Sequence, residues 1–266
     1  MNLWPLFLNH QGRPAHKWVH YFPIYERHFE RYVNRPMTLI EIGCGKGGSL
    51  QLWKQYLGPY ARIVGLDIRP ECKEFEEDQI YVRIGDQSDD GFLLSVIDEF
   101  GPAQIVIDDG SHQMDHIAAS FRCLYPKIAP DGVYFVEDLH TAYWEQFGGG
   151  LRRPGSFIEI SKNLIDELNV ELGRGSASET EFSKTTLSIH FYESVVVFEK
   201  GNSGRKYALR TGKGQECNQL RRKGQECDQL RQQINLIQTS ISWRLTWPLR
   251  WLHVQATRAR KALRYP

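Results

Sequence analysis

The chain has 266 residues, of which 41% are hydrophobic and 24% charged, and its formal net charge is +1. These values are ordinary for a soluble globular protein, and no window approaches the roughly 18 apolar residues of a membrane-spanning helix. The charge is unevenly distributed, however. Residues 205–266 contain 14 Lys/Arg and 3 Asp/Glu, which leaves 19 and 29 of the totals of 33 and 32 for residues 1–204. We therefore predict two domains, 1–204 and 205–266, with different roles.

The cysteines and the N-terminus indicate the cellular compartment. There are five cysteines, with no CxxC motif and no spacing suited to zinc: Cys44, Cys72, Cys123, Cys217 and Cys227. An odd number without a disulfide framework fits a reducing cytosol. The N-terminal MNLWPLFLNHQGR lacks the basic start and the small-residue cleavage site of a signal peptide. We expect a cytoplasmic protein, and a peripheral position at the inner face of the membrane stays open.

Short apolar runs alternate with helical segments along the first domain. The apolar runs are 38–43, 62–68, 81–86, 103–109 and 133–138, and the helical segments are 49–56, 92–100 and 114–128. This alternation predicts a parallel sheet with helices on both faces. Two later runs, 187–192 and 195–200, predict an antiparallel hairpin. The insertion at about 148–183 contains GGG and GRGSAS, and we expect it to form a partly mobile cover.

A glycine-rich turn, EIGCGKGGS at 41–49, follows the first predicted strand and opens a helix. Glycines at such a turn let the backbone approach a ligand closely. The acid two residues before Gly43, Glu41, favours S-adenosylmethionine over a dinucleotide. Asp67 follows 24 residues after Gly43, where a carboxylate can accept hydrogen bonds from both ribose hydroxyls, and Asp86 can face the adenine edge. A purely structural turn with surface acids is the alternative.

Two predicted strands end in paired acids that are followed by a histidine. They are IVIDDGSH at 105–112 and VYFVEDLH at 133–140. Burying a strand that runs into two carboxylates is costly unless a positive group lies there. Ligands of open α/β sheets bind at the carboxyl ends of the strands. We therefore expect a divalent metal or a substrate at these two strand ends.

Five motifs follow one another along the chain: EIGCGKGGSLQLWKQY, GLDI, GDQSD, IDDGSH and FVEDLH. They resemble the metal-dependent sugar O-methyltransferases of macrolide and related glycoside biosynthesis, a family that includes the enzyme historically called cephalosporin hydroxylase. The segment HKWVHYFPIYERHF at 16–29 resembles that family's N-terminal segment, which helps to close the cofactor site. The resemblance covers about residues 14–200. Lys46 in the glycine turn departs from the family pattern and has no interpretation.

The resemblance implies an α/β fold of the class I methyltransferase (Rossmann-like) type. We expect a mostly parallel seven-stranded sheet with a C-terminal antiparallel hairpin, followed by a helical basic tail. The implied cofactors are S-adenosyl-L-methionine and Mg2+. The implied magnesium ligands are Asp109, Glu137 and Asp138, and His112 matches the general base that deprotonates a sugar hydroxyl.

The predicted cofactor-binding residues surround the glycine turn and the ends of neighbouring strands. They are Tyr21, Glu41, Gly43, Gly45, Ser49, Asp67, Asp86 and Asp108. Asp108 is expected mainly to support the turn. The alternative to a catalytic base is that His112 is a residue at a helix N-terminus without catalytic function. His140 fits a substrate contact and a surface position equally well, and Tyr143 and Trp144 fit either a wall for a sugar ring or core packing.

Other metal chemistries and functions have less support. His116 lies four residues after His112, but no third nitrogen ligand follows, so zinc is not expected. A hydroxylase is not expected either, because no clear iron site of two histidines and one carboxylate is evident. A natural-product or catechol-like O-methyltransferase is the first alternative function. A catalytically idle module of the same fold, which recruits glycan enzymes through its tail, is the second.

The basic tail contains a direct repeat, KGQECNQLR at 213–221 and KGQECDQLR at 223–231, whose period of ten fits no coiled coil. Residues 240–266 carry six Lys/Arg and no acid, with Trp and Leu interspersed. Such a segment suits an anionic membrane surface. We predict that it docks to a membrane or to an enzyme of surface-polysaccharide biosynthesis, and a disordered tail is the alternative. On this ground alone, the acceptor sugar is expected to belong to a bacterial surface glycan or its lipid- or nucleotide-linked precursor rather than to a secreted antibiotic. Nucleic-acid binding is disfavoured, and a homo-oligomer stays open.

Overall fold

The computed structural model describes residues 2–173, 178–201, 206, 208 and 228–230. The chain divides into two units, Met1–Lys206 and Tyr207–Pro266, near the predicted boundary between 204 and 205. The predicted docking segment 240–266 and all of the repeat except 228–230 lie outside the described residues. Within the described ranges, no helix has the length and apolar character needed to cross a membrane.

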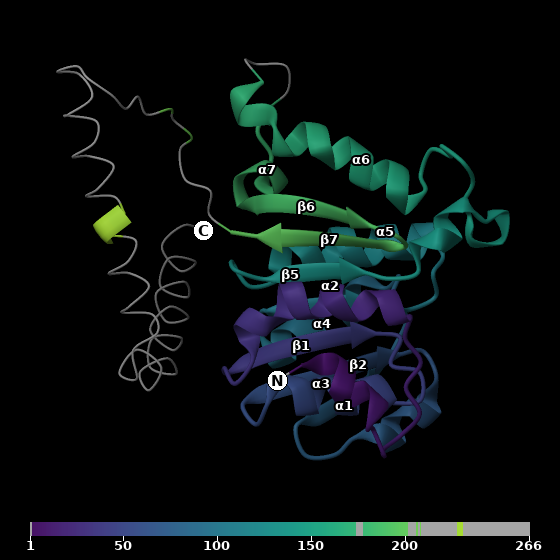
Figure 1. Cartoon of the computed structure of the whole chain (residues 1–266). Helices are drawn as coiled ribbons and strands as arrows, with labels where there is room; N and C mark the ends of the chain where they lie inside the picture. Colours follow the sequence, from purple (N-terminus) through teal and green to yellow (C-terminus); the bar gives the residue numbers. More distant parts are fainter. Residues whose placement is uncertain (1, 174–177, 202–205, 207, 209–227, 231–266) are drawn as a thin grey trace, which may run out of the picture. The chain divides into compact units, whose positions relative to one another are not determined.

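Seven strands form one sheet in the order β3-β2-β1-β4-β5-β7-β6 (Figure 1). The first five pair in parallel, and β7 pairs antiparallel with both β5 and β6. The strands are β1 Met37–Ile42, β2 Ala61–Asp67, β3 Ile80–Ile84, β4 Ile105–Asp108, β5 Val133–Val136, β6 Thr186–Tyr192 and β7 Val195–Lys200. Every residue of β1, β4 and β5 is buried, as expected for strands covered on both faces. The predicted fold class is confirmed.

Helices cover both faces of the sheet (Figure 1). The α-helices are α1 Leu3–Leu8, α2 Phe22–Phe29, α3 Gly48–Leu57, α4 Asp90–Phe100, α5 Met114–Leu124, α6 Phe157–Leu168 and α7 Glu181–Thr185. Helices α1, α2 and α3 pack into one apolar cluster, and α4, α5 and α6 pack into a second cluster. The short 3-10 helices are η1 Val19–Tyr21, η2 Glu30–Tyr32, η3 Pro70–Phe75, η4 Tyr125–Lys127, η5 Leu139–Tyr143, η6 Glu145–Phe147 and η7 Val170–Leu172.

Part of the insertion predicted as a cover, at about 148–183, packs against the core. Its longest element is helix α6, and Phe157 at the start of this helix is fully buried against Phe121, with ring centroids 5.4 Å apart. The Ser156 hydroxyl accepts a hydrogen bond from the backbone N–H of Glu159 and so caps the helix. Ser156 and Glu159 have the spacing of a helix-start motif. The sequence therefore contained a local signal for this helix between the two glycine-rich stretches.

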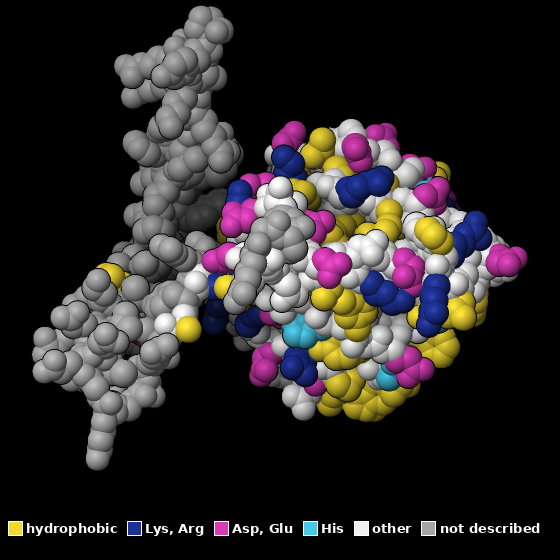
Figure 2. Space-filling view, turned by 90° about the horizontal axis from the view of Figure 1, so that it is seen from above, with side chains coloured by type: hydrophobic (Ala, Val, Ile, Leu, Met, Phe, Trp, Pro, Cys, Tyr) yellow, Lys and Arg dark blue, Asp and Glu magenta, His cyan; other side chains and the backbone are white. Residues whose placement is uncertain are grey.

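The surface of the first unit carries both signs of charge. Figure 2 shows Lys and Arg side chains interspersed with Asp and Glu on the face that it draws, so the acid excess of residues 1–204 is not gathered there. Several acids lie inside the molecule instead. The acids with at most 8% exposure are Glu41, Asp67, Asp108 and Glu137. Since buried carboxylates need partners, their surroundings define the region to examine.

Candidate active site

The glycine turn after β1 touches the end of β4. Gly43 has a φ of +84°, and a Cβ atom there would lie 2.1 Å from the backbone oxygen of Asp109. Only glycine therefore permits this contact. Gly45 has a φ of +57°, and a Cβ atom there would meet nothing within 4 Å. The turn therefore borders an open space that lies next to Asp109.

The open space is a cavity of about 340 Å³ at the carboxyl ends of β1, β2, β3 and β4. It lies where the strand order reverses between β1 and β4, the usual ligand position in open α/β sheets. The predicted cofactor-binding residues that line it are Gly43, Gly45, Asp67 and Asp86. Arg69 and His116 also line it, and sequence reasoning assigned neither to the cofactor. The cavity therefore brings together half of the predicted set.

Two of the three acids that line the cavity, Asp67 and Asp86, are held in their ionised form. Burial raises the pKa of Asp67, but hydrogen bonds from Arg69 and from the backbone N–H of Gly45 outweigh it and hold this pKa below its ordinary value. The guanidinium of Arg69 donates to Asp67 from Nε at 3.0 Å and Nη2 at 3.1 Å. Two hydrogen bonds from Ser88 lower the pKa of Asp86. Ionised carboxylates accept hydrogen bonds from hydroxyl and amino groups, so the cavity suits the nucleoside part of S-adenosylmethionine.

The other four predicted cofactor-binding residues do not line the cavity. The Ser49 hydroxyl donates to Glu41 at 2.7 Å, and both side chains are buried. Asp108 accepts hydrogen bonds from three buried side chains, Gln87, Ser120 and Tyr134. Burial raises the pKa of Asp108 to about 6 against the effect of these bonds. Asp108 thus supports the end of β4, and Tyr21 contacts Asp138 rather than the cavity.

The ends of β4 and β5 bring Asp109, His112 and Asp138 together. The Nε2 atom of His112 lies 4.0 Å from Asp109 Oδ1 and 3.8 Å from Asp138 Oδ2. All three side chains are partly exposed, and their nearest ligand atoms lie within 4.8 Å of one another. His112 and Asp138 both have left-handed backbones, with φ of +58° and +53°. Such backbones cost free energy and concentrate at functional sites.

This group fits a hard divalent cation. The carboxylate oxygens of Asp109 and Asp138 are the ligand type that Mg2+ prefers, and their partial exposure leaves room for water and a substrate oxygen. Two of the three predicted magnesium ligands therefore lie in one group with His112. The third, Glu137, is 1% exposed and does not belong to it.

The ammonium group of Lys17 lies among three carboxylates, one of which is Asp109 of the metal group. Its Nζ atom is 2.7 Å from Asp109, 3.1 Å from Glu137 and 3.2 Å from Glu41, and its side chain is 4% exposed. Burial lowers the pKa of Lys17, but the carboxylates of Asp109 and Glu137 outweigh it and hold this pKa well above its ordinary value. The buried ammonium group is therefore charged. It supplies the positive charge that is needed beside the two strands that end in paired acids.

The adjacent acids Glu137 and Asp138 have different neighbours. Glu137 accepts a hydrogen bond from the Tyr25 hydroxyl at 2.7 Å in addition to the contact with Lys17. Asp138 accepts a hydrogen bond from the Tyr21 hydroxyl at 2.8 Å and lies beside His112. Neither Tyr25 nor Lys17 was predicted from the sequence as a site residue. The structure thus gives Glu137 an interior role and leaves Asp138 at the open site.

Replacing Lys17 by methionine is expected to lower the free energy of unfolding by about 3–5 kcal/mol, because removing one partner of a buried ion pair leaves the other charges uncompensated. Urea denaturation of the purified protein measures this loss. The matched control is Lys46→Met in the glycine turn, where the side chain is exposed and a change within about 0.5 kcal/mol is expected. Equal stability of the two variants would contradict a structural role for the Lys17 ammonium group.

The chain is similar to known proteins. No family model matches the chain. It is 38% identical over 201 residues to the demethylmacrocin O-methyltransferase of Streptomyces fradiae, which is 70% of this chain and 50% of the relative. It is 37% identical over 198 residues to the 8-demethyl-8-(2-methoxy-alpha-L-rhamnosyl)-tetracenomycin-C 3'-O-methyltransferase of Streptomyces olivaceus, again 70% and 50%. The chain spans about half the length of the curated relatives it matches.

A solved structure is similar to this fold. It is the methyltransferase of the mycinamycin biosynthetic pathway, in complex with Mg, SAH and mycinamycin VI. The TM-score is 0.69 and the identity 33%, over 83% of this chain and 59% of that chain. These similarities confirm the resemblance inferred from the five motifs.

Proposed function

Since this chain belongs to the family of sugar O-methyltransferases represented by these relatives, we propose that it methylates a sugar hydroxyl in a reaction that uses S-adenosylmethionine and Mg2+. The bound cofactors supply a reactive methyl group and Lewis acidity toward the hydroxyl. The protein supplies the alignment of the groups and a base. The acceptor is proposed to be a sugar within a glycoside, because the relatives' names include a rhamnosyl tetracenomycin.

The position of Asp109 carries this proposal. Its backbone oxygen lies against Gly43 and it lines the cofactor cavity, while its carboxylate faces His112. The cavity and the group of Asp109, His112 and Asp138 are therefore two parts of one site. A methyl donor in the cavity and a hydroxyl beside His112 would lie next to each other, and such proximity removes much of the entropic barrier to transfer.

His112 is the residue proposed to remove the proton of the acceptor hydroxyl. Its imidazole is partly exposed, so a substrate can reach it, and histidine is the commonest general base near neutral pH. The carboxylates of Asp109 and Asp138, at 4.0 and 3.8 Å, stabilise the positive charge that the ring gains. Tyr21 holds Asp138 through its hydroxyl and so positions one of these carboxylates.

A series of aromatic rings, here called the aromatic rim, leads from the protein surface to His112. Its members are Trp18, His140, Trp144 and Phe147. The ring centroids follow at 5.9, 5.0 and 5.9 Å, and Phe147 lies 6.3 Å from His112. Trp18 and Trp144 are about half exposed, at 48% and 47%. Exposed flat rings beside the base suit the apolar face of a sugar ring, which supports a contact role for Trp144 and His140.

Two functional alternatives have less support. An idle module would have no reason to hold His112 and Asp138 in left-handed backbones beside Asp109. The natural-product half of the first alternative agrees with the relatives, whose names include a rhamnosyl tetracenomycin, and the proposed glycoside acceptor includes it. The catechol-like half agrees with the metal group but not with the rhamnosyl sugar in that name. The surface-polysaccharide context, the cytoplasmic location and docking through 240–266 stay predictions, because the tail that supports the first and third lies outside the described residues.

The experiment is a methyl-transfer assay with labelled S-adenosylmethionine against four acceptor classes: rhamnosylated natural products such as a rhamnosyl tetracenomycin, lipid-linked glycan precursors, nucleotide sugars and catechols. The glycoside is expected to give a kcat/KM at least about 10²-fold above that of catechol, since a site that hydrogen-bonds a substrate discriminates strongly. A preference for catechol would establish the first alternative. Failure to bind S-adenosylmethionine in a calorimetric titration would establish the idle module.

A further inference from the structure

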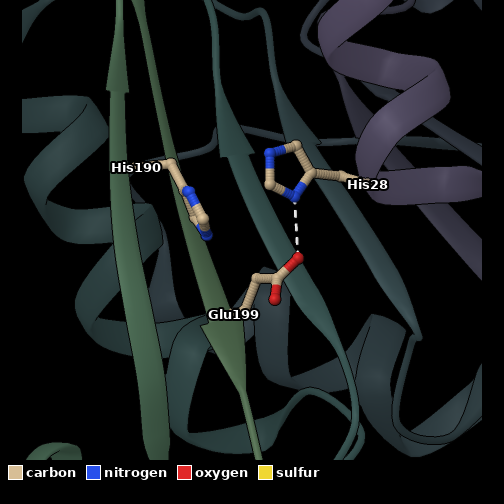
Figure 3. A group of neighbouring side chains, drawn as sticks. All are labelled: His28, His190 and Glu199. Atoms are coloured by element: carbon tan, nitrogen blue, oxygen red, sulfur yellow. Dashed lines mark hydrogen bonds and ion pairs between the residues drawn. The ribbon is translucent and has the colours of Figure 1, made fainter.

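A second group of metal-binding side chains lies between α2 and the β6–β7 hairpin. His28 on α2, His190 on β6 and Glu199 on β7 point toward one another (Figure 3). One ligand atom of each lies within 4.8 Å of the others. Glu199 is paired with Ser188, two residues before His190. Because side chains two residues apart share a face of a strand, His190 and Glu199 both lie on the sheet face that α2 covers.

The two nitrogens of His28 have different partners. Nε2 lies 3.0 Å from the Tyr192 hydroxyl, and Nδ1 lies 2.7 Å from Glu199 Oε1. When Nε2 donates its hydrogen to Tyr192, the lone pair of Nδ1 faces a carboxylate, and a cation between them satisfies both. The Ser188 hydroxyl lies 2.9 Å from Nε2 of His190 and holds that ring. Metal-binding histidines usually have their second nitrogen held in this way.

We propose that His28, His190 and Glu199 bind Zn2+ or a similar borderline transition-metal cation. Two imidazole nitrogens and one carboxylate oxygen favour zinc over magnesium. Tetrahedral zinc with bonds of about 2.0 Å holds its ligand atoms roughly 3.3 Å apart. That spacing is greater than the 2.7 Å of the His28–Glu199 pair, and all three ligand atoms lie within 4.8 Å of one another, so small side-chain rotations complete the site.

The surroundings permit a cation to enter. Arg31 Nη1 lies 3.4 Å from Glu199 Oε1, but the Arg31 side chain is 42% exposed and can turn into solvent. Glu199 is 18% exposed and His190 is also partly exposed, which leaves an open position for water as a fourth ligand. Arg27 adds positive charge near His190, and this charge opposes the binding of a cation.

Zinc bound here would link helix α2 to the β6–β7 hairpin. The same helix carries Tyr25, whose hydroxyl binds Glu137 beneath the candidate active site. A ligand that binds only the folded protein raises its stability. Zinc is therefore expected to raise the thermal unfolding temperature of the protein, and this effect does not depend on methyl transfer.

The test is calorimetric titration of the full-length protein with ZnCl2 in excess MgCl2, together with thermal unfolding at each zinc concentration. His190→Asn and Glu199→Gln are each expected to weaken zinc binding by at least about tenfold and to remove most of the thermal shift. His20→Asn is the control, since His20 is an exposed histidine outside the group, and it should bind zinc like the unmodified protein. Circular dichroism before addition of metal checks that each variant is folded.

Two results would overturn the proposal. Zinc affinity that is unchanged in both His190→Asn and Glu199→Gln, or that is lost in Asp138→Asn instead, would place the metal elsewhere. The second result concerns Cys44, Asp67 and Cys72, which also lie close enough to share a cation. Titration with Co2+ distinguishes the two groups, because cysteine ligands give an intense thiolate charge-transfer band and histidine with carboxylate does not. A thiolate band would contradict binding at His28.

Discussion

Removal of divalent cations is expected to lower methyl transfer by at least about 10²-fold, since Lewis acidity from a bound metal contributes several kcal/mol to such reactions. The carboxylates of Asp109 and Asp138 provide oxygen ligands at the open strand ends. Turnover is measured after dialysis against EDTA and again after addition of MgCl2, which should restore it. Asp138→Asn is expected to raise the Mg2+ concentration needed for half-maximal activity.

Cofactor binding provides the control for this experiment. Glycines, Asp67 and Asp86 line the cavity, so S-adenosylmethionine should still bind after EDTA treatment, with a calorimetric affinity changed by less than about tenfold. Full turnover in chelator would remove Mg2+ from the proposed function. Loss of both turnover and cofactor binding would instead show that the metal maintains the site as a whole.

His112→Ala is expected to lower kcat by about 10²–10⁴-fold, the usual contribution of a general base. The imidazole lies within 4.0 Å of two carboxylates and 6.3 Å from the nearest ring of the aromatic rim, so a sugar packed on that rim would have a hydroxyl near it. Single-turnover kinetics with saturating cofactor measure the effect on the chemical step. His20→Ala, an exposed histidine of η1, should retain normal turnover.

The same variant distinguishes a base from a metal ligand. If His112 acts as the base, the Mg2+ dependence of the residual activity should match that of the unmodified enzyme. If His112 is a ligand, the Mg2+ requirement should rise by at least about tenfold while added metal restores turnover. Normal turnover without any change in Mg2+ dependence would exclude both roles and favour the structural alternative.

Local patterns in the sequence were sufficient for the main architecture. Alternating apolar runs and helical segments predicted the parallel core, and the hairpin at 187–200 was placed correctly. The glycine turn and Asp67 also lie at one cavity as predicted. These features depend on neighbours in the chain, because strand burial, turn geometry and the ends of strands are local properties. Helix α6 was missed despite a local signal, the capping pair Ser156 and Glu159.

The sequence by itself therefore determined the fold, the glycine-rich turn and the two strands that end in paired acids. Only the tertiary structure decided how those acids are used. Lys17 meets Glu41, Asp109 and Glu137 across 24, 92 and 120 residues, and no local pattern reports such contacts. The same holds for His28, which meets Glu199 across 171 residues. A buried charge is stabilised by whichever opposite charge the fold brings near it, so Glu137 pairs with a lysine inside while Asp138 remains open beside His112.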